Sequence, residues 1–451
     1  MIKPFVLAAG TLLGVASSFS DETHPPYAPL EEKARLIWKT KIGIASFRSN
    51  VLFLGNRLHI GSNGEDFMDR GLIESSSGVY AIDRKKGKQL VHFAHERYGD
   101  MDVNGLLLHN NRLFFGNDNE EFLCTDLQGN IQWRNPTSGD IEHEPVLIKS
   151  SVGASVVYAA ESGEVKAVDS QNGNIRWSYY VPDFNGWKPG DNRSLFKIKA
   201  WFSNTGEFYT KPLMQDINKD GVTDLIYLLY SGQLLTLNGN NGKELWRTNE
   251  ENNLSLSVAL VGNANEKMIV GFRNVYTEGY HRSQECVFLS LQGNVIKTIK
   301  LDETFGGSGL NLLSLPDGTV LLNGRTKTYQ IGVQGIVKVI DRKQVYMATR
   351  WDNKKEEEFR NGYDPLFANR TISLPGGKTG VVIMNQRDHA NSEMGFLEIL
   401  SLEDGGVIDR LSIPSISEMP PVIQDVDLDG NLDILISGYD GYLYCYQLPK
   451  Y

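Results

Sequence analysis

The sequence predicts an all-β protein, a β-propeller of eight four-stranded blades whose ring is closed by the N-terminal strand. Three observations predict this fold. A hairpin unit with a glycine in its turn recurs along the chain, another pair of strand-like segments precedes the hairpin, and the last unit lacks its final strand. Each unit spans about 40 to 50 residues, which is the usual length of one propeller blade.

The hairpin unit consists of a strand, a turn of small residues and a strand that carries an aromatic residue. Alternating apolar residues on both sides of the turn indicate strands rather than helices, and Asn-Gly and Gly-Lys pairs at the turns are typical of hairpins. Copies begin at Val79, Leu123, Val165, Leu234, Phe288, Val337 and Leu397, and an eighth lies near Gly441. In the weaker copy at Val337, the first strand is expected to end at Asp341 and the turn has no glycine.

The two ends of the chain are expected to share one blade. The last hairpin ends at Tyr451 and leaves no room for a final strand, whereas residues 34–43 (ARLIWKTKIG) form a strand pattern without a partner. The tryptophan of this segment, Trp38, matches those of three hairpin units: Trp133, Trp177 and Trp246. We therefore expect residues 34–43 to pair with residues 418–451, because closure removes the free edges of the sheets.

Composition and charge narrow the class of protein. Hydrophobic residues make up 41% of the 451 residues and charged residues 22%, which suffices for a packed core and excludes global disorder. The net charge of −10 argues against a nucleic-acid partner, because phosphate binding needs a basic surface. The propeller is expected to form one domain, residues 34–451, and to be a monomer.

The N-terminus has the pattern of an export signal. Lys3 precedes a twelve-residue apolar run, residues 5–16, and small residues follow it. The run is too short to span a bilayer and has the length of a signal-peptide core. Residues 1–20 are therefore predicted to be a signal peptide and residues 21–33 a linker. No later segment has the apolar length of a transmembrane helix, and the protein is expected to be periplasmic or secreted.

The three cysteines, Cys124, Cys286 and Cys445, are too few and too widely spaced for a disulfide framework or a zinc site. One pair could bridge in an oxidising compartment. The alternating apolar residues around Cys124 and Cys445 favour buried thiols in strands instead.

Two aspartate-rich segments carry the strongest chemical signal. Both read D-x-[DN]-x-D-G-x-x-D, and they lie 209 positions apart, at 216 and 425. Side-chain oxygens at alternate positions of a coiled loop converge on one point, and carboxylate and amide oxygens suit Ca²⁺. The sequence therefore predicts two calcium sites. The first takes Asp216, Asn218, Asp220, Asp224 and the carbonyl of Val222, and the second takes Asp425, Asp427, Asp429, Asp433 and the carbonyl of Asn431.

These segments could instead be metal-free turns in which the aspartates cap main-chain N–H groups. Several carboxylates would then lie within a few ångströms of one another, at a cost of about 1 kcal/mol for each like-charged pair near the surface. That repulsion, and the repetition of a nine-residue pattern, favour metal. Because Asp427 stands in place of Asn218, the second site has one more carboxylate and is expected to bind Ca²⁺ more tightly. On an eight-bladed ring, the two sites are expected on opposite sides.

The pattern Ala167-x-Asp169…Gly173…Trp177 resembles the PQQ-like β-propeller repeat, and the aspartate loops resemble the calcium loops of FG-GAP propeller repeats. The resemblance covers residues 34–451 and implies the propeller fold. It implies two kinds of function: quinoprotein dehydrogenases, which bind PQQ and calcium on the propeller axis, and non-catalytic scaffolds of outer-membrane assembly. The chain has no adjacent cysteine pair and no marked quinone site, so PQQ is not expected.

One segment departs from the repeat. Residues 181–208 lengthen the connection into the fourth unit by about 25 residues, and long loops in compact domains are often functional. Aromatic and basic residues alternate there, which makes Trp187 and Trp201 candidates for contact with a protein or glycan partner. The alternative is that these aromatic side chains pack over their own blade.

We therefore expect a non-catalytic binding or scaffold module made rigid by two Ca²⁺ loops. The alternative is an enzyme, either a relative of quinoprotein dehydrogenases or a polysaccharide lyase.

Overall fold

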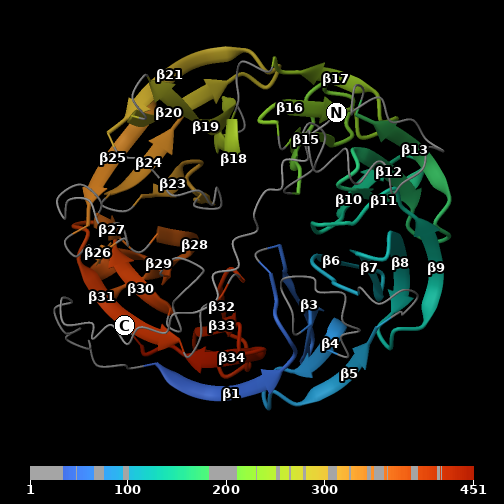
Figure 1. The fold of residues 1–451 in the computed structure, drawn as a ribbon, viewed down its shortest axis with the longest axis horizontal. Helices are drawn as coiled ribbons and strands as arrows, with labels where there is room; N and C mark the ends of the chain where they lie inside the picture. The colour runs from blue at the N-terminus through green and yellow to red at the C-terminus, as the bar shows by residue number, and fades with distance from the viewer. Residues whose placement is uncertain are drawn as a thin grey trace, which may run out of the picture.

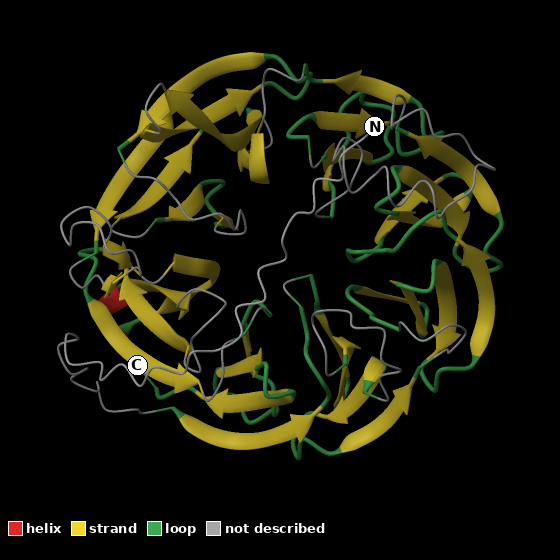
Figure 2. Ribbon diagram, in the orientation of Figure 1, coloured by secondary structure: helices red, strands yellow, loops and turns green. Residues whose placement is uncertain are grey.

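A computed structural model of the chain confirms the all-β prediction: eight four-stranded antiparallel sheets form a ring, each sheet being one blade of a propeller (Figure 1). Strands dominate the described part of the chain (Figure 2), and the helical segment described there is the 3-10 turn η2 (Pro375–Gly377). The structure describes residues 34–46, 48–64, 76–94, 101–181, 211–229, 231–249, 254–263, 266–277, 281–302, 312–324, 327–342, 347–349, 360–362, 364–386, 395–413, 417 and 419–450.

Within each blade the strands run in order from the ring centre to its rim (Figure 1). Blade 1 consists of β2 (Val51–Leu54), β3 (Arg57–Asn63), β4 (Ser77–Asp83) and β5 (Gln89–Phe93). Blade 2 consists of β6 (Leu106–His109), β7 (Arg112–Asn117), β8 (Glu121–Asp126) and β9 (Ile131–Pro136). Blade 3 consists of β10 (Val146–Ser150), β11 (Gly153–Ala159), β12 (Glu164–Asp169) and β13 (Ile175–Tyr180). Blade 4 consists of β14 (Leu213–Gln215), β15 (Asp224–Leu228), β16 (Leu234–Leu237) and β17 (Glu244–Arg247).

The second half of the ring repeats this order. Blade 5 consists of β18 (Leu254–Gly262), β19 (Lys267–Thr277), β20 (His281–Leu289) and β21 (Val295–Leu301). Blade 6 consists of β22 (Leu312–Ser314), β23 (Val320–Asn323), β24 (Lys327–Gly332) and β25 (Gly335–Asp341). After a two-stranded ribbon, β26 (Met347–Thr349) and β27 (Arg360–Gly362), blade 7 consists of β28 (Asp364–Ser373), β29 (Thr379–Gln386), β30 (Gly395–Ser401) and β31 (Val407–Ile413). Blade 8 consists of β32 (Val422–Gln424), β33 (Asp433–Ser437), β34 (Tyr442–Gln447) and β1 (Arg35–Lys41).

The core lies between neighbouring blades. Middle strands such as β15 are buried along their whole length, whereas the rim strand β9 alternates between half-buried and exposed residues. Apolar side chains of adjacent blades form shared clusters, and one of them joins Val157 of blade 3 to Leu225 and Leu235 of blade 4. Because each sheet buries its faces against its neighbours, the blades stabilise one another rather than folding as separate units.

Aromatic side chains on the rim strands lie against the turn glycines of the following blades. A Cβ atom placed on Gly173 would lie 2.6 Å from the ring of Trp133, and one on Gly242 would lie 2.4 Å from Trp177. Both glycines also have positive φ, +75° and +70°, a region that other residues rarely adopt. The recurring glycine of the hairpin unit therefore has two causes, the turn conformation and the approach of the neighbouring indole ring.

Lysines take the place of tryptophan in blades 5 and 6. The Nζ of Lys297 donates to the carbonyl oxygen of Val333 at 2.8 Å, and that of Lys338 donates to Leu402 at 2.6 Å. The indole N–H of Trp177 makes the corresponding bond to Gly239 at 3.1 Å. Each donor reaches a main-chain carbonyl in the next blade's turn.

The two ends of the chain share blade 8, as the sequence predicts. Strand β1 pairs antiparallel with β34, from Arg35 opposite Gln447 to Lys41 opposite Tyr442. Trp38 then contacts Gly87 of blade 1, and its indole N–H donates to the carbonyl of Arg84 at 2.8 Å. The N-terminal strand thus packs its tryptophan on the turn glycine of the next blade as the other rim tryptophans do, and it makes the same indole hydrogen bond as Trp177.

The prediction for the sixth hairpin unit is wrong in its register. Residues from Val337 to Asp341 belong to the rim strand β25, not to the third strand of the blade, which is β24. The turn lies at residues 333–334, and Val337 and Val339 are 61% and 45% exposed. An alternating apolar strand at the rim has the same sequence pattern as a buried inner strand, so the pattern alone misplaces the turn.

The three cysteines are buried in β8, β20 and β34 as free thiols, as expected. Within the described residues, the structure contains no helix with the length and hydropathy of a membrane-spanning segment. The predicted signal peptide (1–20) and linker (21–33) lie outside the described residues.

Candidate metal centres

The two aspartate loops occupy matching places in opposite blades. The first connects β14 to β15 in blade 4, and the second connects β32 to β33 in blade 8. Three blades separate them on each side, so they lie across the ring from one another (Figure 1). This confirms the placement expected from the 209-residue offset between the two motifs.

The backbones of the two loops follow the same path. In the first, the carboxylate of Asp224 accepts from the N–H of Ile217 at 2.8 Å, and in the second Asp433 accepts from Val426 at 2.7 Å. Gly221 and Gly430 have φ of +83° and +87° with no atom near a hypothetical Cβ, so the turn conformation alone requires glycine there. The coiling that the sequence predicts is therefore present in both loops.

Several predicted ligands also act as turn caps. The N–H of Val222 donates to Asp220 and the N–H of Asn431 donates to Asp429, both at 2.8 Å. Asn218 Oδ1 accepts from the N–H of Asp220 at 2.9 Å. The loop geometry therefore suits hydrogen-bonded turns as well as cation sites. Which of the two a loop forms depends on whether carboxylate oxygens remain that accept no hydrogen bond from the protein.

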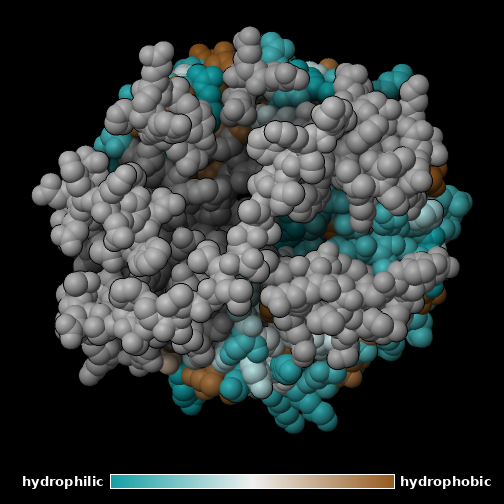
Figure 3. Space-filling model, in the orientation of Figure 1, coloured by the Kyte–Doolittle hydropathy of each residue, from teal (hydrophilic) through white to brown (hydrophobic). Residues whose placement is uncertain are grey.

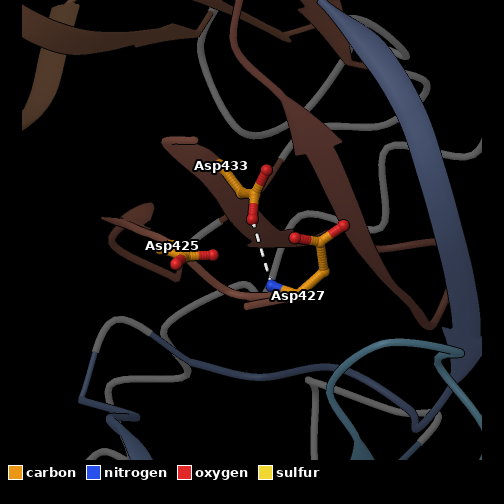
Figure 4. Close-up of side chains that lie close together, drawn as sticks. All are labelled: Asp425, Asp427 and Asp433. Atoms are coloured by element: carbon orange, nitrogen blue, oxygen red, sulfur yellow. Dashed lines mark hydrogen bonds between the residues drawn. The ribbon is translucent and has the colours of Figure 1, made fainter. Parts of the chain in front are cut away.

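The second loop concentrates negative charge. One carboxylate oxygen from each of Asp425, Asp427 and Asp433 lies within 4.8 Å of the other two (Figure 4). Burial raises the pKa of Asp433 to about 6, and the nearby Asp427 and Asp429 carboxylates contribute to the rise. Burial and the charge of Asp429 also raise the pKa of Asp427. Asp427 and Asp433 therefore resist ionisation together, which a bound cation would relieve.

One oxygen of Asp433 has no hydrogen-bond partner. The residue is 0% exposed, its Oδ2 accepts from the main chain, and its Oδ1 is buried without a donor. A buried carboxylate oxygen without a donor is costly unless a cation or water satisfies it. This oxygen, next to two further carboxylates, has the charge and hardness that Ca²⁺ requires.

The first loop is better satisfied by protein groups. The side-chain amide of Asn238 donates to Asp220 at 2.9 Å, and this bond and the N–H of Val222 hold the pKa of Asp220 below its usual value. The N–H of Gly239 donates to Asp224 Oδ1 at 3.0 Å, although burial still raises the pKa of Asp224. Asp216 Oδ1 is the buried oxygen left without a donor in this loop. The first loop thus has less need of a cation than the second.

The difference between the loops follows from how blade 8 is assembled. Asn238 and Gly239 belong to the hairpin turn that joins β16 to the rim strand β17. Blade 8 has no such turn, because its rim strand β1 comes from the N-terminus. Gln447 stands 209 positions after Asn238 and donates to Asp429, but the N–H of Leu448 bonds to the carbonyl of Leu432 instead of to Asp433.

A second polar cluster, not singled out by the sequence, lies where the innermost strands of blades 1 to 4 begin. Arg48 pairs with Glu142, and Lys211 pairs with Glu144. Asn104 donates to Glu142 at 3.0 Å, joining three blades. Seen along the ring axis, a hollow lies near the middle of the molecule and hydrophilic residues border it beside blades 2 and 3 (Figure 3). No local motif marks this cluster, because its members come from four separate loops.

His143 is buried beside this cluster. Its Nδ1 lies 3.0 Å from the carbonyl oxygen of Glu144, and its Nε2 has no partner. Burial lowers its pKa to about 4, so the imidazole is neutral at physiological pH. The candidate partner residues Trp187 and Trp201 lie outside the described residues.

Part of the chain matches a known family. Residues 75–183 match the family model described as outer membrane protein assembly factor BamB. The match takes in the last two strands of blade 1 and all of blades 2 and 3, which is less than half of the chain. No curated protein matches the sequence.

Solved structures share the whole ring. BamB from Moraxella catarrhalis aligns over 93% of this chain and 98% of its own, with a TM-score of 0.52 and 11% identity. A europium-containing methanol dehydrogenase aligns over 92% and 94%, with a TM-score of 0.55 and 13% identity. A quinohemoprotein alcohol dehydrogenase from Pseudomonas putida aligns over 92% of this chain but 76% of its own, with a TM-score of 0.50 and 11% identity. At such identities, the likeness shows a common fold and nothing of function.

Proposed function

Because the chain is a PQQ-like β-propeller of eight blades, we propose that it is an exported, non-catalytic scaffold that binds a protein partner and is made rigid by Ca²⁺ in its two aspartate loops. The observation that carries the calcium part is the buried, unpartnered Oδ1 of Asp433 beside the carboxylates of Asp425 and Asp427. The loops resemble FG-GAP calcium loops in sequence, which supports the same assignment.

The scaffold part is supported by the family match and by the polar cluster at the inner strands. The matched family and one aligned structure carry the name of an outer membrane protein assembly factor. In this chain, the described acidic residues of the inner cluster are already neutralised: Glu142 pairs with Arg48 and Glu144 with Lys211. Neutralised carboxylates suit the joining of blades better than proton transfer or metal activation.

Calorimetric titration of chelator-treated protein with CaCl₂ tests the metal assignment. We expect two binding events, the tighter in the second loop. Asp429→Ala should remove the tighter event and Asp220→Ala the weaker. At a hundredfold excess over Kd, each site should add about 2.7 kcal/mol to the free energy of unfolding.

Asp317→Ala is the matched control for this titration. Asp317 caps the N–H of Thr319 at 2.9 Å in the corresponding loop of blade 6, which has no aspartate cluster. Its replacement should leave both binding events intact. The metal assignment would be contradicted if the unmodified protein bound no calcium and if chelator left its melting temperature unchanged.

The partner-binding part is tested on the insertion. Chemical crosslinking in the native envelope should join the unmodified protein to a defined partner, and the double variant Trp187→Ala and Trp201→Ala should lose that product without a change in melting temperature. A large loss of stability in the variant would instead show that these tryptophans pack inside the protein.

An enzymatic function of the quinoprotein type is the alternative, because a methanol dehydrogenase shares this fold. The described residues of the inner cluster do not fit a calcium–quinone centre, because their carboxylates are held by Arg48 and Lys211. Mixing the protein with PQQ and CaCl₂ and recording the quinone absorbance after gel filtration distinguishes the two functions. Co-elution of the quinone at a one-to-one ratio would support the enzyme.

A further inference from the structure

We infer that cation binding in the second aspartate loop and docking of the N-terminal strand β1 are coupled, so that the cation locks the ring at the seam where its two ends meet. The inference rests on the calcium assignment proposed above and adds a regulatory role for one of the two sites. It follows from three sets of contacts that differ between the second loop and the first.

The first set concerns the missing hairpin of blade 8. In blade 4, the covalent turn between the third and fourth strands supplies Asn238 and Gly239, which donate to Asp220 at 2.9 Å and to Asp224 at 3.0 Å. In blade 8, the third strand ends at Gln447 and the fourth strand begins at Arg35, with no turn between them. The unpartnered oxygen of Asp433 is therefore a direct result of closing the ring with the N-terminus.

The second set links the loop to the N-terminal strand through one side chain. The amide nitrogen of Gln447 donates to Asp429, and its amide oxygen accepts from the guanidinium of Arg35 at 3.0 Å. Arg35 is the first residue of β1 and lies opposite Gln447 in the strand register. Ordering of Asp429 by a cation therefore orders Gln447, which in turn holds the start of β1.

The third set links the loop to blade 1. The guanidinium of Arg84 donates to the carbonyl oxygens of Val426 at 2.7 Å and Asp425 at 2.6 Å. The carbonyl of Arg84 accepts from the indole of Trp38 in β1 at 2.8 Å. Arg84 therefore contacts the loop with its side chain and the closing strand with its main chain.

Among the described residues, the first aspartate loop has no equivalent of these hydrogen bonds from Arg84. In blade 5, the place of Arg84 is taken by Leu291, which packs with Ile217 and Trp246 in an apolar cluster. Contacts of that kind depend little on the position of individual loop carbonyls. Hydrogen bonds from a guanidinium do depend on them, because they require both distance and direction.

The consequence is a linkage between two equilibria. A cation that holds the four aspartates of the second loop in place fixes the carbonyls that Arg84 contacts and the carboxylate that Gln447 contacts. Docking of β1 then becomes more favourable, and by reciprocity a docked β1 raises the affinity of the loop for the cation. The first loop stabilises its blade without affecting the seam.

Hydrogen exchange of the full-length chain, in chelator and in saturating CaCl₂, tests the coupling. Amides of β1, residues 35–41, should exchange at least about fivefold more slowly in Ca²⁺, the low end of ordinary coupling between sites. The rim strand of blade 4, residues 244–247, is the internal control, because it lies beside the first loop but is tied by a covalent turn. Its exchange should change by less than half as much.

Three kinds of variant separate the contributions. Asp429→Ala should abolish the effect on β1, and Asp220→Ala should leave it intact. Gln447→Ala should keep both calcium binding events in calorimetry but reduce the effect on β1, because the link to Arg35 is lost. Arg84→Lys, which keeps the charge but not the fork of donors, should act in the same direction.

The outcomes distinguish the coupling from the calcium assignment on which it rests. Calcium binding to both loops with no slowing at β1, or with equal slowing at residues 35–41 and 244–247, would overturn the coupling and leave the metal assignment standing. No calcium binding at all would overturn the metal assignment and the coupling with it.

Discussion

Replacement of Asp433 by asparagine should stabilise the calcium-free protein at neutral pH. The side chain keeps one oxygen to accept from Val426 and Asp427, and the oxygen without a donor becomes an amide that can donate to a neighbouring carboxylate. Buried aspartate is usually a stabilising cap, so a gain in stability would be unusual. It follows only if the carboxylate is held in a site that lacks a cation.

The magnitude comes from the pKa of Asp433. Burial and neighbouring carboxylates raise it to about 6, against about 3.9 in an unfolded chain. A difference of about two units corresponds to about 3 kcal/mol that ionised Asp433 removes from the folded state at pH 7.5. We expect Asp433→Asn to recover about 2 to 3 kcal/mol of this in chelator.

The pH dependence has a definite sign. A raised folded pKa means that the folded state binds the proton more tightly than the unfolded state does. In chelator, Asp433 should therefore cost the unmodified protein less stability as the pH falls through 6, and the recovery should be complete only below the unfolded pKa of about 3.9. The stability advantage of Asp433→Asn should shrink over the same range.

Urea unfolding followed by tryptophan fluorescence, at pH 7.5 and pH 5 with and without CaCl₂, measures these differences. In saturating CaCl₂ the order should reverse, because only the unmodified protein gains binding energy from the second loop. Asp224→Asn is the matched control and should destabilise, because Gly239 donates to the oxygen that becomes an amide. Lower stability of Asp433→Asn in chelator at pH 7.5 would refute the reasoning and identify Asp433 as an ordinary turn cap.

Two further changes test the fold. Gly173→Ala should cost about 1 to 3 kcal/mol in thermal unfolding, because its Cβ would lie 2.6 Å from Trp133. Gly376→Ala is the control and should cost less, because Gly376 has a similar φ of +74° but no atom within 4 Å of a hypothetical Cβ. Equal losses of stability in the two variants would show that φ alone matters. Glu398→Gln should cost about 3 to 5 kcal/mol, because Glu398 is 0% exposed and pairs with Arg342 at 2.8 Å and Arg410 at 2.6 Å. A neutral effect of Glu398→Gln in the same melts would show that water reaches these guanidinium groups.

Much of the ring can be predicted from sequence because its units repeat. The turn glycines and rim tryptophans recur with the hairpins, and the spare tryptophan Trp38 indicates how the ring closes. The sixth unit is misplaced because Val337 and Val339 alternate like buried residues although they are exposed at the rim. Alternation of apolar and polar residues indicates that a strand has two different faces, but it does not indicate the position of that strand within the blade.

The candidate metal centres could be predicted only in part. The ligand types and the glycine of each loop lie within nine residues, so the coiled loops follow from local chemistry. The unequal satisfaction of the two loops does not, because it depends on the absent turn of blade 8. The contact of Arg84 with the second loop, 341 positions away, has no local signal either. The inner cluster of Arg48 and Glu142 was missed for the same reason.

The closing of the ring by β1 also places a demand on folding. Arg35 and Gln447 are hydrogen-bonded neighbours 412 positions apart in the chain. For a flexible chain each doubling of a loop adds about 0.6 kcal/mol, so this closure costs about 4 kcal/mol more than that of a short hairpin. Among the described strands, β1 is synthesised first and its partner β34 last. The strand that completes the propeller must therefore stay unpaired, with Leu36 and Trp38 accessible to chaperones, until the strands of all eight blades have been made.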